Sequence, residues 1–238
     1  MSDSASRIAM NLFSVRQRMA AAAERSGRPA EAVRLVAVTK YVGTAEIEAL
    51  LAAGCRDLGE ARPQDLWRKA ETFRGRDVAW HLIGHLQRNK VARTLPLVDL
   101  LHSADSESLL MAIDAWGRSA ARAAEVLLEV NISGDAAKHG FQPDDIVPLW
   151  PRLALLGGIR IRGLMGMSGR EAQPDEVRRQ FAALRVLRDK LLATGTDAAA
   201  FSELSMGMTD DFEIAIEEGA TLVRVGSALF EGIENLRG

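Results

Sequence analysis

The sequence contains one cysteine, Cys55, so an intramolecular disulfide and a metal cluster built from cysteine sulfurs are both excluded. We expect Cys55 to be a small buried hydrophobic residue. A strong charge of either sign is also missing, with 30 lysines and arginines against 32 aspartates and glutamates. This balance gives no electrostatic basis for binding nucleic acid or a membrane surface, and neither is expected as a partner.

Long apolar runs are absent too. No stretch reaches the length that a transmembrane helix needs. The first residues, 1–4, lack the charged and then apolar layout of a signal peptide. The composition is otherwise typical of a globular protein, with 47% hydrophobic residues. We therefore expect a cytoplasmic protein with a sizeable core.

What the sequence does contain is a regular alternation of short apolar strands and amphipathic helices. A first helix is predicted over residues 4–27, and a helical pattern follows each of the first seven strands. The eight predicted strands cover residues 33–39, 55–59, 78–83, 98–102, 125–131, 159–165, 201–204 and 221–225. Alternation of this kind predicts a parallel sheet.

Eight such units in 238 residues match the size of a (β/α)8 TIM barrel. The alternative is a doubly wound open sheet, which usually has fewer strands. We expect an α/β fold with a single domain over residues 1–238. It would consist of an extra N-terminal helix (1–27), the barrel (33–227) and a tail (228–238). Since little chain follows the eighth strand, the N-terminal helix is expected to cover that gap.

The first predicted strand ends in a lysine. Residues 35–39 form the continuous apolar run expected of a parallel strand that is covered on both faces, and Lys40 follows. Ligands of α/β proteins bind at this end of the strands. A half-buried amine beside apolar surface loses proton affinity, which makes Lys40 a candidate Schiff-base nucleophile. The alternative is a lysine that extends into solvent at a strand end.

Polar and small residues also gather at the carboxyl ends of the other predicted strands. In a barrel, these ends form one ring around the mouth. The ring would contain Lys40, Glu60, His81, Gly84, Ser103, Asn131, Met165, Met167, Ser205, Gly207, Arg224, Gly226 and Ser227.

The end of the eighth strand predicts a phosphate site. Gly226 and Ser227 offer backbone N–H groups and a hydroxyl, and Ser205 would face the same spot from the seventh strand. Two glycine turns with capping serines are the alternative. Arg224 points to the same side of its strand as Gly226, and it needs a partner because an unpaired buried charge is costly. Glu60 or an atom of a ligand would serve.

A lysine, a phosphate site and an arginine around one mouth indicate a phosphorylated carbonyl ligand. From these residues, two chemistries remain open. One is pyridoxal 5′-phosphate (PLP) bound to Lys40. The other is a Schiff-base aldolase that acts on a sugar phosphate without a cofactor.

Seven segments carry recognisable motifs: 36–40 (VAVTK), 58–60 (LGE), 80–90 (WHLIGHLQRNK), 130–133 (VNIS), 162–167 (RGLMGM), 204–212 (LSMGMTDDF) and 223–227 (VRVGS). Together they resemble the pyridoxal phosphate homeostasis proteins of the YggS/PROSC family. The resemblance covers nearly the whole chain, and the segments 80–90 and 204–212 are the specific ones. It implies a barrel like the N-terminal domain of alanine racemase, with PLP held as an internal aldimine on Lys40. It also implies that Arg224 faces the pyridine nitrogen and that Ser205, Gly226 and Ser227 hold the phosphate.

Further residues are assigned to the expected cofactor site: His81 and Asn131 stand in the ring, and Met206 could line it. His81 would be an aromatic wall or a hydrogen-bonding residue behind the cofactor, with a role as general acid or base as the alternative. The alternative for Met206 is a place in the core, which methionine fills more often.

Three positions depart from the family pattern. Ala61 stands where asparagine is usual, which removes a polar contact near the cofactor, and His85 stands where proline is common. Ser227 stands where threonine is usual and keeps the hydroxyl, so phosphate binding is still expected.

Three functions compete. The first is a PLP-binding protein that takes part in PLP homeostasis by buffering the cofactor or delivering it to apo-PLP enzymes, without efficient catalysis. The second is a PLP-dependent amino-acid racemase, but racemases with this barrel have a second domain that supplies an opposing base. The third is the aldolase. We expect a monomer or a weak homodimer, and no metal, because His85, His102 and His139 show no metal-ligand spacing.

Overall fold

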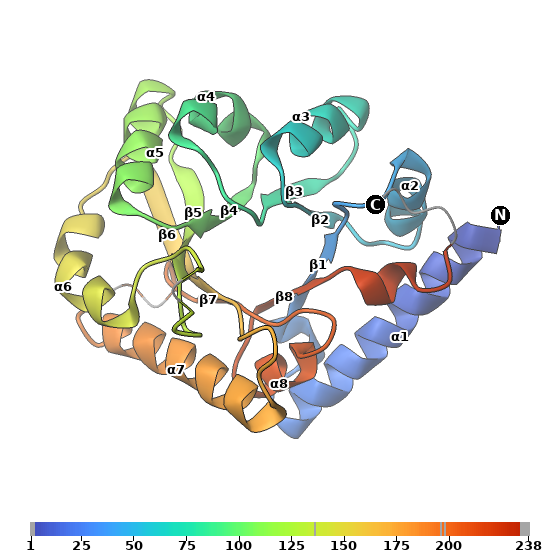
Figure 1. Ribbon diagram of the computed structural model, residues 1–238. Helices are drawn as coiled ribbons and strands as arrows, with labels where there is room; N and C mark the ends of the chain where they lie inside the picture. Colours follow the sequence, from blue (N-terminus) through green and yellow to red (C-terminus); the bar gives the residue numbers. More distant parts are fainter. Residues whose placement is uncertain (1–2, 136, 196, 198, 234–238) are drawn as a thin grey trace.

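The structure is a computed structural model that describes residues 3–135, 137–195, 197 and 199–233 (Figure 1). Its strands form a closed parallel barrel in sequence order. They are β1 (Arg34–Val38), β2 (Asp57–Glu60), β3 (Ala79–Leu82), β4 (Leu100–Ala104), β5 (Ala124–Val130), β6 (Ile159–Gly166), β7 (Glu203–Ser205) and β8 (Leu222–Val225). The last strand pairs with the first, and Arg224 lies opposite Val36. This closure confirms the predicted barrel and excludes an open sheet.

Helices surround the ring of strands (Figure 1). They are α1 (Asp3–Arg25), α2 (Thr44–Ala52), α3 (Pro63–Thr72), α4 (Val91–Thr94), α5 (Glu107–Ser119), α6 (Pro143–Leu153), α7 (Pro174–Leu192) and α8 (Phe212–Glu217). Among the described residues, no helix is both long and apolar enough to span a membrane. Part of the expected tail, 234–238, lies outside the described residues.

Two of the differences from the sequence-based expectation have a clear local cause. The helix expected at 87–94 is divided into a 3₁₀ turn (Arg88–Lys90) and the single turn of α4, after which Pro96 prevents continuation. The seventh strand begins at Glu203 instead of residue 201, because the backbone N–H of Phe201 still bonds to Asp197 in a preceding turn. Phe201 packs its ring on Trp150 instead, with 4.9 Å between centroids.

The N-terminal helix takes the place of a helix after β8, as expected. Within residues 226–233, the described part of the chain after that strand, the helical element is a 3₁₀ turn (Ser227–Phe230). In Figure 1, α1 runs along this side of the barrel between α2 and α8. Asn11 of α1 donates to the carbonyls of Leu229 and Glu231 at 3.2 and 3.0 Å, which satisfies the end of the 3₁₀ turn. The first helix is therefore part of the helix layer that surrounds the barrel.

The interior of the barrel contains a small apolar cluster, separate from the large core between the sheet and the helices. Its members lie on five different strands, at positions that point inward: Val36, Leu100, Leu127, Met165 and Leu222. Polar and charged side chains occupy other inward positions of the same strands. The barrel therefore carries hydrogen-bonding groups through its middle as well as at its mouth.

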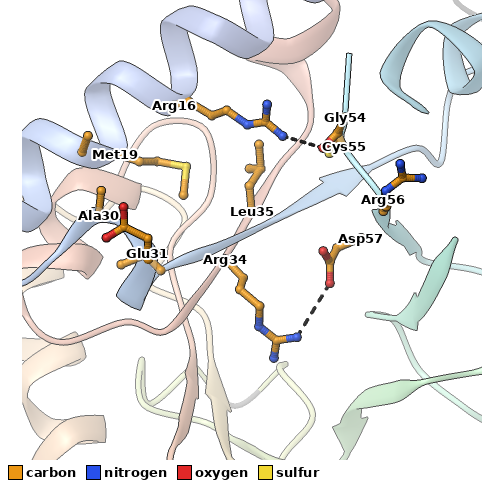
Figure 2. Close-up of a pocket in the computed structure, with 12 residues that line it drawn as sticks. Arg16, Met19, Ala30, Glu31, Arg34, Leu35, Gly54, Cys55, Arg56 and Asp57 are labelled. Carbon is orange, nitrogen blue, oxygen red and sulfur yellow. Dashed lines mark hydrogen bonds and ion pairs between the residues drawn. The ribbon is translucent and has the colours of Figure 1, made fainter. Parts of the chain in front are cut away.

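A cavity of about 340 Å³ lies at the amino-terminal end of the barrel, between α1 and β1 (Figure 2). Arg16 borders it and donates to the carbonyl of Gly54 at 2.8 Å, which ties α1 to the end of α2. Cys55 also lines this cavity and is buried, as predicted, and burial raises the pKa of its thiol to about 11. This end of a barrel normally serves stability, and it is opposite to the ring of candidate residues.

Candidate functional site

Lys40 lies just beyond β1, on a turn, and its side chain is exposed. The ammonium group stands over the ring of Tyr41, 4.8 Å from the centroid. The prediction of a half-buried lysine is wrong, because β1 ends at Val38 and Lys40 already belongs to the turn at the rim. The amine is therefore accessible from solvent at the mouth.

A buried ion pair lies directly beneath Lys40. The Lys69 ammonium donates to the Glu60 carboxylate at 2.7 Å and to the carbonyl of Thr39 at 2.6 Å. The Thr39 hydroxyl donates to the same Glu60 oxygen at 2.5 Å. The other oxygen of Glu60 is buried and has no hydrogen-bond partner among the residues that the structure describes.

This arrangement corrects the expectation that Glu60 could serve as the partner of Arg224. Along β2, Leu58 packs in the core under the helices, so Glu60, two residues later, faces the helix layer as well. Lys69 of α3 meets it there. Sequence reasoning missed Lys69, although it falls on the buried stripe of α3 with Leu66 and Ala70. Since Lys69 holds the carbonyl of Thr39, it fixes the backbone from which Lys40 extends.

Arg224 is buried inside the barrel, with 3% of its surface exposed. Its guanidinium donates to the hydroxyl of Ser205 at 2.6 Å and to the carbonyl of Gly166 at 3.2 Å. Burial lowers the pKa of Arg224 to about 10, and the charges of Asp211 and Glu129 oppose that shift. Among the described residues, no carboxylate forms an ion pair with Arg224. A buried cation whose hydrogen-bond partners are both neutral favours a ligand that accepts hydrogen bonds.

A row of hydrogen bonds continues from Arg224 through the barrel. The hydroxyl of Ser205 lies 2.8 Å from Nδ1 of His102. Nε2 of His102 lies 2.9 Å from Nδ1 of His81, and Nε2 of His81 lies 3.1 Å from the carboxylate of Asp57. His81, His102 and Ser205 are all buried. The row thus links the mouth with the amino-terminal end of the barrel.

The direction of these bonds follows from their two ends. Arg224 can only donate and the Asp57 carboxylate can only accept. Ser205 therefore donates to Nδ1 of His102, His102 donates from Nε2 to His81, and His81 donates from Nε2 to Asp57. Burial, followed by the charges of His81, Arg224 and Arg34, lowers the pKa of His102 well below its usual value, which keeps this imidazole neutral.

A different group of residues gathers at the end of β8. The hydroxyl of Ser227 donates to the hydroxyl oxygen of Thr209 at 3.0 Å, and the backbone N–H of Gly226 donates to the same oxygen at 3.4 Å. Ser227 is exposed and Thr209 is partly exposed. Sequence reasoning missed Thr209, although it lies in the specific segment 204–212.

The other predicted residues lie in separate surroundings. Ser205 points into the barrel, and its single proton is committed to His102. Met206 alternates with Ser205, faces the helix layer and is fully buried in the main core, so its side chain does not line the mouth. Asn131 uses its amide on its own loop, donating to the carbonyl of Asp135 at 2.8 Å. His81 lies deep in the barrel behind His102. Gly226 and Ser227 therefore share Thr209 as a hydrogen-bond partner, whereas Ser205 bonds to Arg224 and His102 inside the barrel.

Comparison with known proteins places the chain among its relatives. Residues 10–233 match the family model described as alanine racemase, N-terminal domain. The pyridoxal phosphate homeostasis protein of Aquifex aeolicus is 37% identical over 92% of this chain and 95% of its own length. The protein of the same name from Pseudomonas aeruginosa is 36% identical over 94% of this chain and 95% of its own length. The chain belongs to the family of pyridoxal phosphate homeostasis proteins.

A solved relative in the family has its ligand in place. It is PipY of Synechococcus elongatus with PLP bound, 34% identical to this chain, with a TM-score of 0.81. The alignment covers 94% of this chain and 99% of that one. The two structures therefore share the barrel over nearly their whole lengths.

Two of the positions that depart from the family pattern, Ala61 and His85, lie on the neighbouring loops after β2 and β3. The carbonyl of Ala61 would lie 2.2 Å from a Cβ added to Gly84, so residue 84 can only be glycine beside this backbone. His85 follows, and its Nδ1 lies 2.7 Å from the carboxylate of Asp105. The histidine found in place of proline therefore has a polar partner at the rim.

Proposed function

We propose that this chain binds PLP at the carboxyl end of its barrel, holds it covalently through Lys40, and serves intracellular PLP homeostasis by storing the cofactor and passing it on. The observation that carries this proposal is the juxtaposition of β1 and β8. Ala37 pairs with Val225, and a Cβ added to Gly226 would lie 3.3 Å from that of Val38. The loop at Gly226 thus lies beside the turn that presents Lys40.

The groups at the end of β8 fit a phosphate. Ser227 and Gly226 direct an O–H and an N–H toward the oxygen of Thr209, where a phosphate oxygen could accept both. The Thr209 hydroxyl carries one more donor. The predicted contact from Ser205 would require its bond to His102 to break, so we assign the phosphate to Gly226, Ser227 and Thr209.

Arg224 fits the opposite end of the same small ligand. Even with its pKa lowered to about 10, it stays charged at neutral pH and can only donate hydrogen bonds. It therefore offers an N–H to an aromatic nitrogen and cannot supply that nitrogen with a proton of its own. PLP supplies an aldehyde that reacts reversibly with primary amines, and enzymes rely on its protonated ring as an electron sink.

The exposure of Lys40 favours exchange over controlled catalysis. A solvent-accessible amine can release and take up an aldehyde, whereas racemisation needs a water-excluded site and a positioned base on each face. We therefore propose storage and transfer to apo-PLP enzymes, and we do not propose efficient racemase activity.

We expect borohydride treatment of the PLP-loaded protein to fix the pyridoxyl group on Lys40, located by peptide mapping. Lys40→Ala should lose the covalent label and the associated visible absorbance. Lys190→Ala is the matched control, since Lys190 is also exposed, and it should label like the wild type. A label found mainly on Lys69, Lys90 or Lys138 would overturn the assignment.

We expect Ser227→Asp to weaken PLP retention at least tenfold, because it places a negative charge beside the phosphate dianion. Ser227→Thr keeps the hydroxyl and should retain PLP like the wild type. Equilibrium dialysis of the two variants measures the effect. Equal retention by both would show that the phosphate lies elsewhere.

A further inference from the structure

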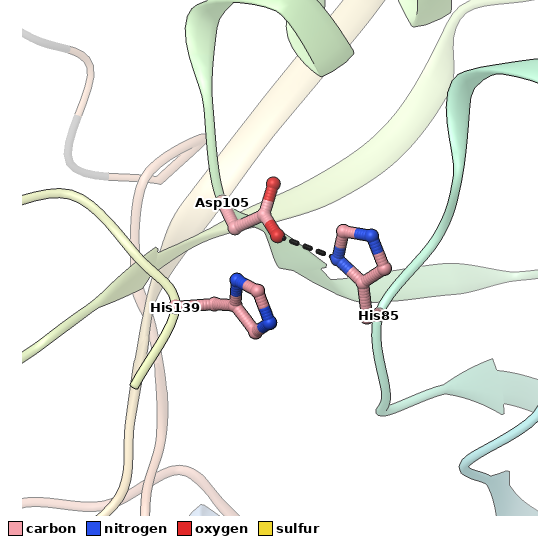
Figure 3. A group of neighbouring side chains, drawn as sticks. All are labelled: His85, Asp105 and His139. Atoms are coloured by element: carbon pink, nitrogen blue, oxygen red, sulfur yellow. Dashed lines mark hydrogen bonds and ion pairs between the residues drawn. The ribbon is translucent and has the colours of Figure 1, made fainter. Parts of the chain in front are cut away.

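Two histidines and an aspartate meet at the rim of the barrel (Figure 3). They are His85 after β3, Asp105 after β4 and His139 after β5, and their candidate ligand atoms all lie within 4.8 Å of one another. His85 and Asp105 are 2.7 Å apart. The imidazole rings of His85 and His139 are stacked, with 4.9 Å between centroids.

Each of the three residues is fixed at its backbone. The Ser103 hydroxyl donates to the carbonyl of Gly84 at 2.7 Å, which holds the residue before His85 against the end of β4. Asp105 follows β4 directly. The residues after His139 return to β5, where the N–H of Phe141 bonds to the carbonyl of Glu129 at 2.8 Å. The ends of three neighbouring strands therefore hold the cluster in place.

A second observation is the carboxylate of Glu129 on β5. Its residue is only 6% exposed, and among the described residues the carboxylate has no hydrogen-bond or ion-pair partner. It lies close enough to Asp105 and His85 for their charges to act on it. When it is ionised, this second carboxylate adds negative charge beside the cluster, and a bound cation would offset that charge.

We propose that His85, Asp105 and His139 bind one divalent transition-metal ion of the Zn²⁺ class. Two imidazoles and one carboxylate are the ligands that Zn²⁺, Co²⁺ and Ni²⁺ prefer, and three protein ligands leave a position open to water. Tetrahedral Zn²⁺ sites hold their ligand atoms roughly 3.3–3.5 Å apart. The spread of up to 4.8 Å closes when the ring planes, now 20° from parallel, rotate so that their nitrogens converge. Both histidines are exposed at the rim, so their rings are not enclosed by the core.

The sequence conceals this set because its members lie on three separate loops. Their spacings of 20 and 34 residues match no metal-binding motif. The other two histidines, His81 and His102, are buried in the hydrogen-bonded row and cannot serve as surface ligands. The proposed site does not depend on PLP.

Isothermal titration of the full, tag-free and PLP-free chain with Zn²⁺ tests the proposal. We expect saturation at one equivalent. His85→Ala, Asp105→Asn and His139→Ala should each weaken binding at least tenfold. Asp144→Asn changes an exposed acid that lies outside the cluster, and it should bind like the wild type. Thermal melting without metal shows that each variant is folded.

Co²⁺ provides an independent readout, because its visible absorption reports nitrogen and oxygen ligation. We expect a Co²⁺ spectrum with the wild type that disappears in the His85→Ala, His139→Ala double variant. Stoichiometric binding that survives in the double variant would place the metal elsewhere. Absence of binding to the wild type up to millimolar Zn²⁺ would overturn the proposal outright.

Discussion

Replacing Lys69 with methionine should lower the free energy of unfolding by about 3–5 kcal/mol. The substitution keeps an unbranched side chain of similar length but removes the ammonium that neutralises Glu60. Both side chains are almost inaccessible, at 8% and 0%, so water cannot take over that role. Glu60 would keep only the hydroxyl of Thr39 as a donor. Urea unfolding followed by circular dichroism measures the change.

A second substitution isolates the cause of that loss. In the Lys69→Met, Glu60→Gln double variant the buried charge is gone, so we expect recovery of at least half of the lost stability. Lys190→Met changes an exposed lysine and should stay within about 0.5 kcal/mol of the wild type. A Lys69→Met protein that loses less than about 1 kcal/mol would show that the pair contributes little.

Replacing Glu129 with glutamine should raise the free energy of unfolding at pH 8 by roughly 2–3 kcal/mol. Burial, followed by the charge of Asp105, raises the pKa of Glu129 from 4.5 to about 7, with Arg224 and His85 opposing. The folded state therefore holds this proton more tightly than the unfolded state. Its contribution to stability is present below pH 4.5 and is lost as the pH rises through about 7. Glutamine cannot lose a proton, so the variant escapes that loss.

The same reasoning predicts how the gain depends on pH. The gain in the free energy of unfolding should shrink toward zero as the pH falls to 4.5. It should be measured with a chelator present. His102 makes stability depend on pH in the opposite direction. Its pKa is lowered in the folded state, so protonation below pH 6.5 favours unfolding. The variant should therefore lose stability with acid more steeply than the wild type. Glu24→Gln, on the exposed face of α1, is the control. A gain that is the same at pH 5 and pH 8 would contradict the assignment.

The barrel could be predicted from sequence because its determinants are local. Apolar runs and helical spacing alternate along the chain, and parallel strands place their carboxyl ends together. The rim positions of Lys40 and Ser227 follow from that rule alone. The exposure of Lys40 did not follow, since it depends on β1 ending two residues before it.

Side-chain partners were harder to predict because they depend on which face of a strand each residue occupies and on register between strands. Glu60 faces the helix layer, so its partner is on α3 and not in the mouth. The pairing of β3 with β4, in which His81 lies opposite Leu100, brings the imidazole of His81 to that of His102. No spacing along the chain contains that information. Alternation along β7 could have excluded Met206 from the mouth, since Ser205 was already placed inside.

The row of hydrogen bonds from Arg224 to Asp57 also makes its members depend on one another. Each hydroxyl or imidazole in the row accepts one bond and donates the next, so the position of every proton depends on its neighbours. Replacing His102 with a residue that cannot accept from Ser205 would leave the Ser205 proton available to another acceptor. The partly exposed carboxylate of Asp57 therefore helps to orient a buried O–H at the far end of the same row.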